Sequence, residues 1–326
     1  MNQILDIQTS QQQALLYLLT FLKQHNYQFT TITPLSHQRI LNRKRHQASQ
    51  EMTLRDIFGW NLPFQKTDLD SELFAILDQH FLLQKQGEHY SSLVRVSSLE
   101  DDLFIHSAFP TVEQDAIFFG PDTYRFAYHL KQYLASQSRP FKRAVELCCG
   151  TSAAAVAIAK KFPNYNELIV ADLNPKALNY SQMNINFAGL KNIYPVQSNL
   201  FSNIEGKFDL IFVNPPYLID PQQRHYRHGG HEMDGCDLAF QIIKKGIQRL
   251  NSQGHLFLYT GVPIHQSGNR FLQCLEELMA QQKNISWFYE EIDPDIFGEE
   301  LEQPSYQHIE RIALALVKIK RVICQY

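Results

Sequence analysis

The fold is decided by a strand that passes into a turn of small residues and then into a helix, Ala144-Val-Glu-Leu-Cys-Cys-Gly-Thr-Ser152. In open α/β sheets, ligands bind beyond the carboxyl ends of the strands, close to the first strand–helix turn. The turn lacks the GxGxxG pattern of dinucleotide folds, and the chain contains no P-loop motif. We therefore expect a nucleotide-like ligand without phosphates at this turn.

Downstream of Arg143, apolar strands alternate regularly with amphipathic helices, which predicts βαβ units and a parallel sheet. The last two strands are joined by a loop, so one late strand is expected to be antiparallel. The predicted fold is α/β, a doubly wound, mostly parallel sheet of seven strands. The strands are expected at residues 144–148, 168–172, 193–197, 208–213, 255–260, 285–290 and 312–319, and the helices at about 152–161, 175–187, 238–250 and 270–281.

The chain upstream of this alternation is predicted to be a separate unit. We assign residues 1–115 to a smaller, mostly helical substrate-recognition domain and residues 116–326 to the α/β domain. Helical spacing of apolar residues at 11–26, 53–58 and 71–83, followed by strand-like segments at 90–97 and 102–106, is compatible with a winged-helix-like module. Its excess of acidic side chains disfavours DNA recognition, and the basic run 39–45 is interpreted as a solvated helix face.

The overall composition describes a globular protein. The 326 residues are 44% hydrophobic and 19% charged, with a net charge of −3, which disfavours a large nucleic-acid interface. The five cysteines at 148, 149, 236, 274 and 324 form no CxxC pair and are expected to be reduced thiols. No apolar run of about 18 residues occurs and the N-terminus lacks a signal pattern, so we expect no membrane segment and a cytoplasmic location.

Polar residues follow three successive strands of the predicted sheet. Glu146 lies in the first strand shortly before its end and is suited to binding a cationic amino-acid group, while Gly150 lets the backbone approach the ligand closely. Asp172 ends the second strand, where a carboxylate can accept both hydroxyls of a ribose. Asn199 follows the third strand and can present its amide to an adenine edge. Cys148, in the same turn as Gly150, and Asn214, after the fourth strand, complete the expected cofactor site.

The most specific motif is Asn214-Pro-Pro-Tyr217, which follows an apolar strand. The prolines stiffen the turn and remove two N–H donors, so the Asn214 side-chain carbonyl and the Pro215 main-chain carbonyl remain as acceptors. Two fixed acceptors suit an NH2 group whose lone pair is delocalised, because holding both hydrogens favours the pyramidal, nucleophilic form. Tyr217 is expected to lie flat on the planar substrate, and Pro216 to contact it.

These motifs resemble the class I S-adenosylmethionine (SAM)-dependent methyltransferases with an NPPY motif, especially the release factor glutamine methyltransferase group (HemK/PrmC type). The resemblance covers residues 120–278 and includes Pro121-Asp-Thr123, the turn after Glu146, and the motif at 214–217. It implies that SAM is the cofactor, bound by Glu146, Gly150, Asp172 and Asn199, with residues 121–125 nearby. It also implies that Asn214 and Pro215 hold a target amide.

The chain departs from the group's pattern at three places. Cys148 and Ser152 stand where the group's DLGTGSG turn has its outer glycines. The segment Arg224-His-Tyr-Arg-His-Gly-Gly-His231 is more basic than the expected linker, and the N-terminal unit does not obviously match the group's small helical domain. For these reasons the identity of the substrate is not carried over from the resemblance.

Two further groups of residues, in the segment after the motif and at the junction of the two domains, are candidates for roles in the site. The histidines at 225, 228 and 231 are spaced three apart, but we favour a mobile loop over a metal site and expect no metal. Arg224 and Arg227 of this loop are candidates for binding an anionic substrate group, with solvated loop charges as the alternative. Tyr124 and Arg125 are expected to line the pocket where the two domains meet.

The sequence therefore predicts SAM-dependent N-methylation of a planar amide or amino nitrogen, with a protein glutamine as the first candidate. Adenine N6 in RNA or DNA and a small-molecule nitrogen remain alternatives within the same chemistry, and a SAM-binding protein without turnover is an alternative of another class. A protein or small-molecule partner is favoured over nucleic acid, and no membrane partner is expected.

Overall fold

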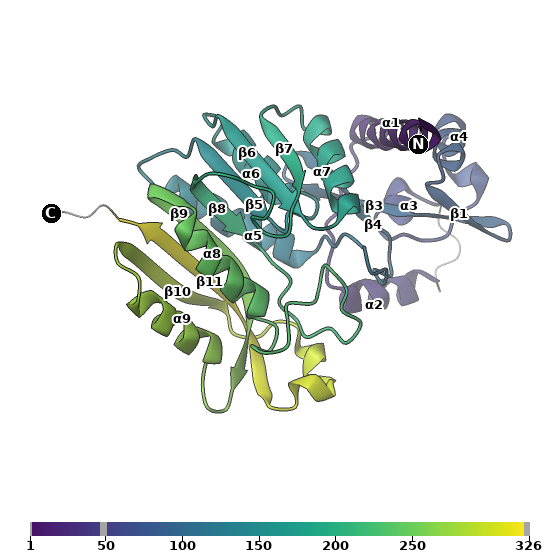
Figure 1. Ribbon diagram of the computed structural model, residues 1–326. Helices are drawn as coiled ribbons and strands as arrows, with labels where there is room; N and C mark the ends of the chain where they lie inside the picture. Colours follow the sequence, from purple (N-terminus) through teal and green to yellow (C-terminus); the bar gives the residue numbers. More distant parts are fainter. Residues whose placement is uncertain (1, 46–50, 323–326) are drawn as a thin grey trace.

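The computed structural model describes residues 2–45 and 51–322, and its centre is a seven-stranded sheet in the order β10-β11-β9-β8-β5-β6-β7 (Figure 1). Parallel pairing joins β9, β8, β5, β6 and β7, whereas β11 pairs antiparallel with both β9 and β10. The predicted doubly wound sheet with a late antiparallel strand is confirmed. The strands are β5 (Arg143–Leu147), β6 (Glu167–Asp172), β7 (Ile193–Gln197), β8 (Phe208–Val213), β9 (Leu250–His265), β10 (Ile285–Asp293) and β11 (Ile309–Arg321).

Helices cover both faces of this sheet because its central strands are apolar on both sides. In β8, Phe212 packs with one face and Ile211 with the other. The first face is covered by α5 (Pro121–Ala135), α6 (Ala153–Lys161) and α7 (Pro175–Phe187), and the second by α8 (Asp237–Gln248) and α9 (Arg270–Ala280). Burying the apolar surface of such strands stabilises the fold by about 25 cal/mol per Å².

The strand order reverses at β5. From β5 the chain runs through β6 to β7 toward one edge, and β8 with β9 then lies on the opposite side of β5. A ligand site in such a sheet lies beyond the carboxyl ends of the strands at this switch point. The turn after β5 and the motif after β8 therefore lie next to each other at this edge of the sheet.

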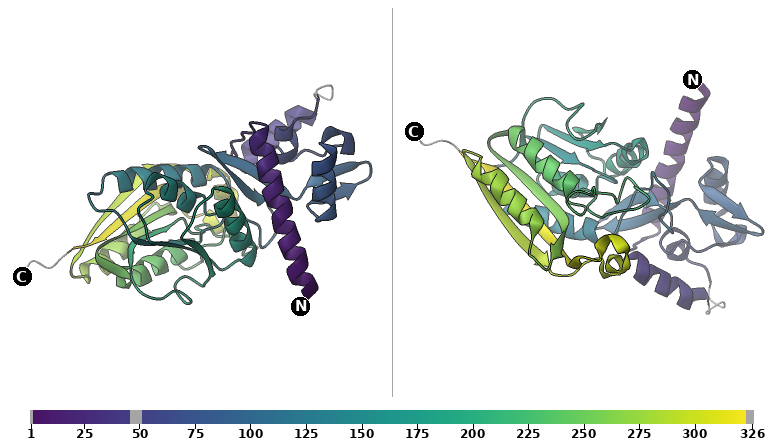
Figure 2. Two further views of the ribbon diagram at one scale, coloured as in Figure 1. Left: turned by 90° about the horizontal axis from the view of Figure 1, so that it is seen from above. Right: turned by 60° about the horizontal axis from the view of Figure 1, so that its bottom comes forward.

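The N-terminal unit has its own core beside the β7–α7 end of the sheet (Figures 1 and 2). Its elements are the helices α1 (Asn2–Gln24), α2 (Pro34–Arg45), α3 (Leu54–Phe58), α4 (Ser71–Gln79) and the strands β1 (Leu83–Gln86), β2 (His89–Ser92), β3 (Val94–Leu99) and β4 (Asp102–Ser107). The core continues into α7 through Tyr180 and Met183, and Ile105 N–H donates to the Asn184 side chain at 2.9 Å. The N-terminal unit is thus packed onto the α/β domain, while the domain boundary at residue 115 stays a prediction.

Helix α5 and the surroundings of Lys44 differ from what the sequence analysis expected. Helix α5 was not predicted, although Pro121 at its start and buried Phe126 and Leu130 along one face are ordinary helix features. The basic run 39–45 lies on α2 as expected, but Lys44 is not simply solvated, because its ammonium pairs with Asp56 at 2.7 Å. The Arg45 side chain lies outside the described residues.

The cysteines in the described part of the chain form no disulfide. Cys148, Cys149, Cys236 and Cys274 carry free thiols, and Cys324 lies outside the described residues. Burial and the nearby Asp172 and Glu146 carboxylates raise the pKa of the Cys148 thiol, which makes it a poor nucleophile. No helix among the described residues is both long and apolar enough to span a membrane.

Candidate active site

A cavity of about 860 Å³ opens at the carboxyl ends of β5, β6 and β8. It brings together the predicted cofactor residues and the predicted substrate loop, although the turn at Gly150 and the motif at Asn214 lie more than 60 residues apart in the sequence. The predicted site residues in its lining are Glu146, Cys148, Gly150, Asp172, Asn199, Asn214, Pro215, Pro216, Tyr217, Arg224 and Arg227. Tyr124 and Arg125 are not part of this lining.

The turn after β5 has an unusual backbone. Cys148, Gly150 and Ser152 have φ values of 51°, 53° and 56°, in the left-handed region that favours glycine. Cys148 and Ser152, which stand where the related group has glycine, thus adopt a backbone conformation that costs roughly 1–2 kcal/mol for each side chain. At Gly150 an added Cβ would meet no atom within 4 Å, so the backbone there is exposed to the cavity.

Two carboxylates flank this turn. Glu146 is buried, accepts a hydrogen bond from Ala155 N–H at 3.2 Å, and has its pKa raised well above the usual value by burial. Asp172 accepts from Gly150 N–H at 3.0 Å and from Asn174 N–H at 2.9 Å, while burial raises its pKa as well. Each Asp172 oxygen uses one lone pair in this way and keeps another for a ligand hydroxyl. A cation beside Glu146 would favour its ionised form.

Beyond β8, the Asn214 side chain makes no hydrogen bond with any other described residue, and it lines the cavity. Asn199 also lines the cavity, and only its backbone is engaged: its N–H donates to Ser202 Oγ at 3.2 Å and its carbonyl accepts from Ser202 N–H at 3.1 Å. Both side-chain amides are thus free to bind ligands, as the sequence analysis expected. Their contacts with cofactor and substrate stay predictions.

Tyr217 is held more firmly than the sequence suggested. Its ring meets Phe297 at an interplanar angle of 67°, and a Cβ added at Gly261 would lie 2.4 Å from the ring. Its hydroxyl donates to Asp122 Oδ2 at 2.5 Å, and Tyr259 Oη donates to Asp122 Oδ1 at 2.7 Å. Tyr217 therefore anchors the loop to α5, and its expected stacking on the substrate stays a prediction.

Asp122 is a site residue that sequence reasoning did not single out. It is 7% exposed, lines the cavity and accepts hydrogen bonds from both tyrosine hydroxyls. The only signal was its place in Pro121-Asp-Thr123, which the family resemblance put near the cofactor. The pairing itself was invisible because Asp122 and Tyr217 are 95 residues apart.

Tyr124 and Arg125 lie at the junction of the two units but do not line the cavity. Tyr124 Oη accepts from Thr31 N–H at 3.0 Å, and its ring meets Phe119 edge-on. Arg125 pairs with Asp122 at 3.5 Å and with Asp293 at 3.6 Å. The expectation that they line the pocket is corrected, because α5 turns these neighbours of Asp122 toward other elements.

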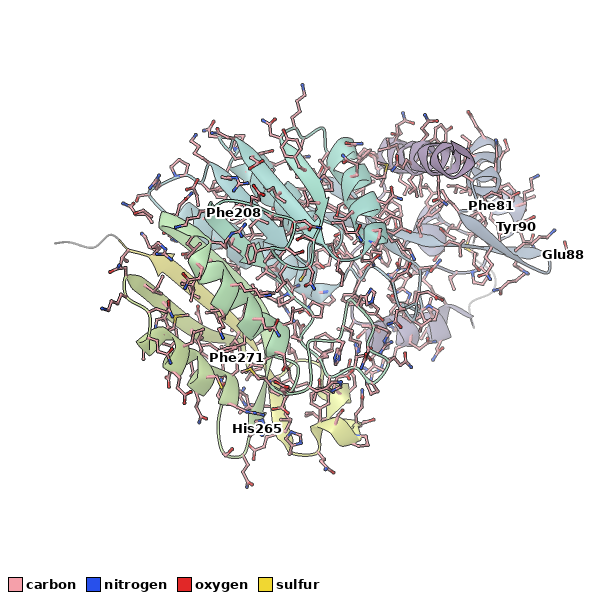
Figure 3. All side chains as sticks on the ribbon, viewed as in Figure 1. Phe81, Glu88, Tyr90, Phe208, His265 and Phe271 are labelled. Carbon is pink, nitrogen blue, oxygen red and sulfur yellow. The ribbon has the colours of Figure 1, made fainter. Side chains whose placement is uncertain are left out.

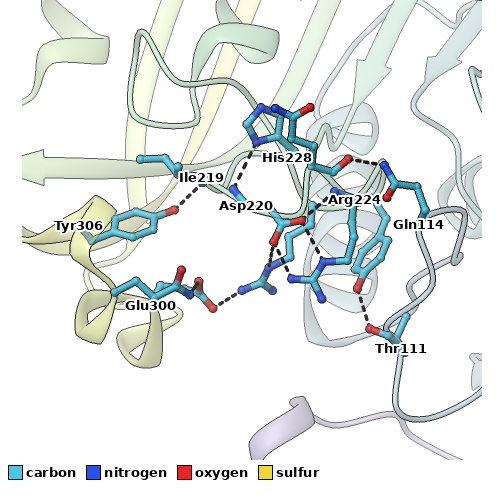
Figure 4. Close-up of polar contacts among 12 residues, drawn as sticks. Thr111, Gln114, Ile219, Asp220, Arg224, His228, Glu300 and Tyr306 are labelled. Atoms are coloured by element: carbon cyan, nitrogen blue, oxygen red, sulfur yellow. Dashed lines mark hydrogen bonds and ion pairs between the residues drawn. The ribbon is translucent and has the colours of Figure 1, made fainter.

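The segment 218–236, which follows the motif, is extensively bonded on both sides (Figure 4). Gly229 N–H donates to Leu218 O at 2.9 Å, Tyr226 Oη donates to Thr111 O at 2.7 Å, and Ile219 N–H donates to Tyr306 Oη at 2.7 Å. Its histidines do not converge on a common point in the described structure. The segment is therefore an ordered cover of the cavity, and a closing motion stays a prediction.

The two arginines of this segment are already paired. Arg224 donates to Asp220 through Nε at 2.9 Å and Nη2 at 2.6 Å, and Arg227 pairs with Glu300 and lies 3.7 Å from Asp220. Burial alone would raise the pKa of Asp220, but the bonds from Arg224 outweigh it and lower that pKa. Arg224 and Arg227 thus hold the cover together, which leaves little positive charge for an anionic substrate.

Known proteins resemble this chain over the α/β domain. Residues 127–285 match the family model described as the methyltransferase small domain. The release factor glutamine methyltransferase of Escherichia coli K12 is 32% identical over 212 residues, covering 61% of this chain and 72% of the relative. The ribosomal protein uL3 glutamine methyltransferase of Neisseria gonorrhoeae is 30% identical over 128 residues, 36% of this chain and 42% of the relative.

Among solved structures, the ribosomal protein L11 methylase of Lactobacillus delbrueckii subsp. bulgaricus has a TM-score of 0.41 and 15% identity, covering 63% of this chain and 81% of that one. The sequence match to the Escherichia coli enzyme spans most of that relative, and the resemblance recognised from the motifs is confirmed. The chain belongs to the release factor glutamine methyltransferase family (HemK/PrmC type) and is a SAM-dependent methyltransferase.

Proposed function

We propose that this methyltransferase acts on the side-chain amide nitrogen of a glutamine in a protein substrate. The observation that carries the proposal is the shared cavity. Asn214 and Pro215 line it at the end of β8, and Glu146, Gly150 and Asp172 line it at the ends of β5 and β6. Relatives from two organisms are named as glutamine methyltransferases of a release factor and of ribosomal protein uL3.

The cofactor supplies an electrophilic methyl group on its sulfonium, and the protein residues bind and orient. In the proposal, Glu146 takes the cationic amino group of SAM, Asp172 the ribose hydroxyls and Asn199 the adenine edge. Asn214 Oδ1 and the Pro215 carbonyl accept the two hydrogens of the target amide, which directs its nitrogen lone pair at the methyl group. Asp122 keeps these acceptors in place through Tyr217.

The outer part of the cavity favours a protein over a nucleic acid. The N-terminal unit and the segment after β4 contribute Pro34, Leu35, Phe109, Pro110 and Val112 to the lining. Leu35 and Val112 are 47% and 54% exposed, so this rim presents apolar side chains to an incoming substrate. A phosphate backbone would need unpaired cations, but Arg224 and Arg227 are neutralised by Asp220 and Glu300.

The test is methyl transfer from labelled SAM to purified release factor and to purified uL3, with the modified residue located by mass spectrometry. We expect one methyl group on a glutamine of one of these proteins. Asn214→Ala is expected to lower kcat by about 10²–10³-fold, the range for loss of one preorganised hydrogen-bonding group, with SAM binding by calorimetry retained.

Two controls separate the alternatives. Nuclease-treated, protease-treated and ultrafiltered cell extracts are offered as substrates in parallel, and transfer is measured at low and high salt. Label on adenine, with a steep salt dependence, would identify a nucleic-acid substrate instead. Label that appears only in the small-molecule fraction would also refute the proposal.

A further inference from the structure

A cluster of three potential metal ligands lies outside the catalytic cavity. Asp234 belongs to the segment before α8, His265 ends β9 (Figure 3), and His308 directly precedes β11. His265 Nε2 lies 2.9 Å from Asp234 Oδ2, and His308 Nε2 lies 3.1 Å from Asp234 Oδ1. The three ligand atoms lie within 4.8 Å of one another, and none of these residues lines the cavity.

We propose that Asp234, His265 and His308 bind a divalent transition-metal ion of the zinc class. Two imidazole nitrogens and a carboxylate form a common donor set for such ions. Ligand atoms about 2.0–2.1 Å from a tetrahedral ion are roughly 3.3 Å apart, close to the two nitrogen–oxygen distances observed. The His308 side chain is 48% exposed, which leaves a path for the ion and for a water molecule as fourth ligand.

The same contacts are also those of a hydrogen-bonded cluster without metal, in which both histidines donate to one carboxylate. One cation competes directly with a metal, because Arg270 Nη1 lies 3.6 Å from Asp234 Oδ2. The Arg270 side chain is 53% exposed at the start of α9 and can turn into solvent at little cost. This neighbour provides a test, since removing it must strengthen metal binding if the ion occupies the carboxylate.

A metal ion at this site would restrain the loop of residues 214–217 from outside the cavity. Gly235 follows Asp234 and packs so closely that an added Cβ would lie 2.3 Å from the Tyr217 carbonyl oxygen. A Cβ added at Gly229 would likewise lie 2.7 Å from the Pro216 carbonyl oxygen. By joining Asp234 to β9 and β11, the ion would hold the segment with Gly229 and Gly235 against the Pro216–Tyr217 backbone. The bound ion would have a structural role and would take no part in methyl transfer.

The experiment uses the full chain, freed of metal by a chelator and returned to metal-free buffer. Zinc chloride is titrated by calorimetry, and cobalt chloride is titrated with visible absorption as the readout. We expect one equivalent to bind, cobalt to give the spectrum of a tetrahedral nitrogen–oxygen site without a thiolate charge-transfer band, and zinc to raise Tm.

Variants locate the site. His308→Ala, at an exposed position, is expected to weaken binding at least 100-fold while leaving the metal-free Tm unchanged, and Asp234→Asn is expected to weaken it as well. Arg270→Gln is expected to strengthen binding several-fold, and the matched control His231→Ala to leave it unchanged. The proposal is overturned by the absence of saturable one-to-one binding, by unaltered binding in His308→Ala, by weaker binding in Arg270→Gln, or by a thiolate cobalt spectrum.

Discussion

The contact between Asp122 and Tyr217 allows a quantitative test of how the catalytic loop is positioned. Asp122, Tyr217 and Tyr259 are 7%, 6% and 0% exposed, and the carboxylate accepts a hydrogen bond from each tyrosine. A buried hydroxyl left without a partner costs about 1–3 kcal/mol. Asp122→Ala removes the carboxylate that accepts from both hydroxyls and is therefore expected to reduce the free energy of unfolding by about 2–6 kcal/mol.

Removing a tyrosine hydroxyl should cost less, because the carboxylate keeps its other donor. Tyr217→Phe and Tyr259→Phe are each expected to lose about 1.5–3 kcal/mol, the value of one hydrogen bond to a charged group. The double variant Asp122→Ala/Tyr217→Phe has no Tyr217 hydroxyl that could be left without an acceptor. Its loss of stability should therefore be smaller than the sum of the two single losses by about 1.5–3 kcal/mol.

Urea unfolding measures these free energies, and steady-state methyl transfer with a protein substrate measures the consequence for the site. Tyr217→Phe is expected to lower kcat while leaving SAM binding intact, because Tyr217 lines the cavity. Tyr259→Phe is the matched control, since it loses a similar bond to the same carboxylate without lining the cavity. Additive losses of stability, or an equal fall of kcat in both tyrosine variants, would refute the reasoning.

Three further predictions follow. Burial raises the pKa of Glu146, so the native state holds its proton more tightly than the unfolded state and stability declines as pH rises above about 4.3; Glu146→Gln should flatten this decline in thermal unfolding and weaken SAM binding by calorimetry. Gly261→Ala pushes a methyl group into the Tyr217 ring and should cost about 1–3 kcal/mol in urea unfolding, with a lower kcat. Arg224→Gln leaves the buried Asp220 carboxylate short of a partner and should lower the free energy of unfolding by about 3 kcal/mol above pH 4. Because the Asp220 pKa is lowered in the folded protein, this difference between variant and parent should vanish as pH falls through the folded pKa. Unfolding measured at pH 3 and at pH 7 would reveal the change.

Local patterns were enough to predict the sheet. Apolar strands of four to eight residues with helices between them dictate a parallel sheet, and the acid or amide after each strand end must then face the same edge. The sequence therefore placed Glu146, Asp172, Asn199 and Asn214 around one pocket, as the cavity lining bears out. The left-handed backbone at Cys148 and Ser152 was not predicted, although the family pattern has glycine at both positions.

The partners of charged side chains could not be predicted in this way. Arg227 looked available to an anionic substrate until the fold brought Glu300 from a distant segment to pair with it. Tyr124 and Arg125 looked like pocket residues because they lie where the two units meet, but successive helical positions point in different directions.

The sequence by itself determined the α/β sheet, the order of its strands along the chain and the acceptor pair of the motif, because these depend on periodicity and on side-chain chemistry within a few residues. Only the tertiary structure decided that Asp122 receives the hydroxyls of Tyr217 and Tyr259, and that Asp234 meets His265 and His308. These contacts join residues 31 to 137 positions apart. They exist because packing the helices and loops on the sheet brings distant segments within hydrogen-bonding distance, which no local pattern encodes.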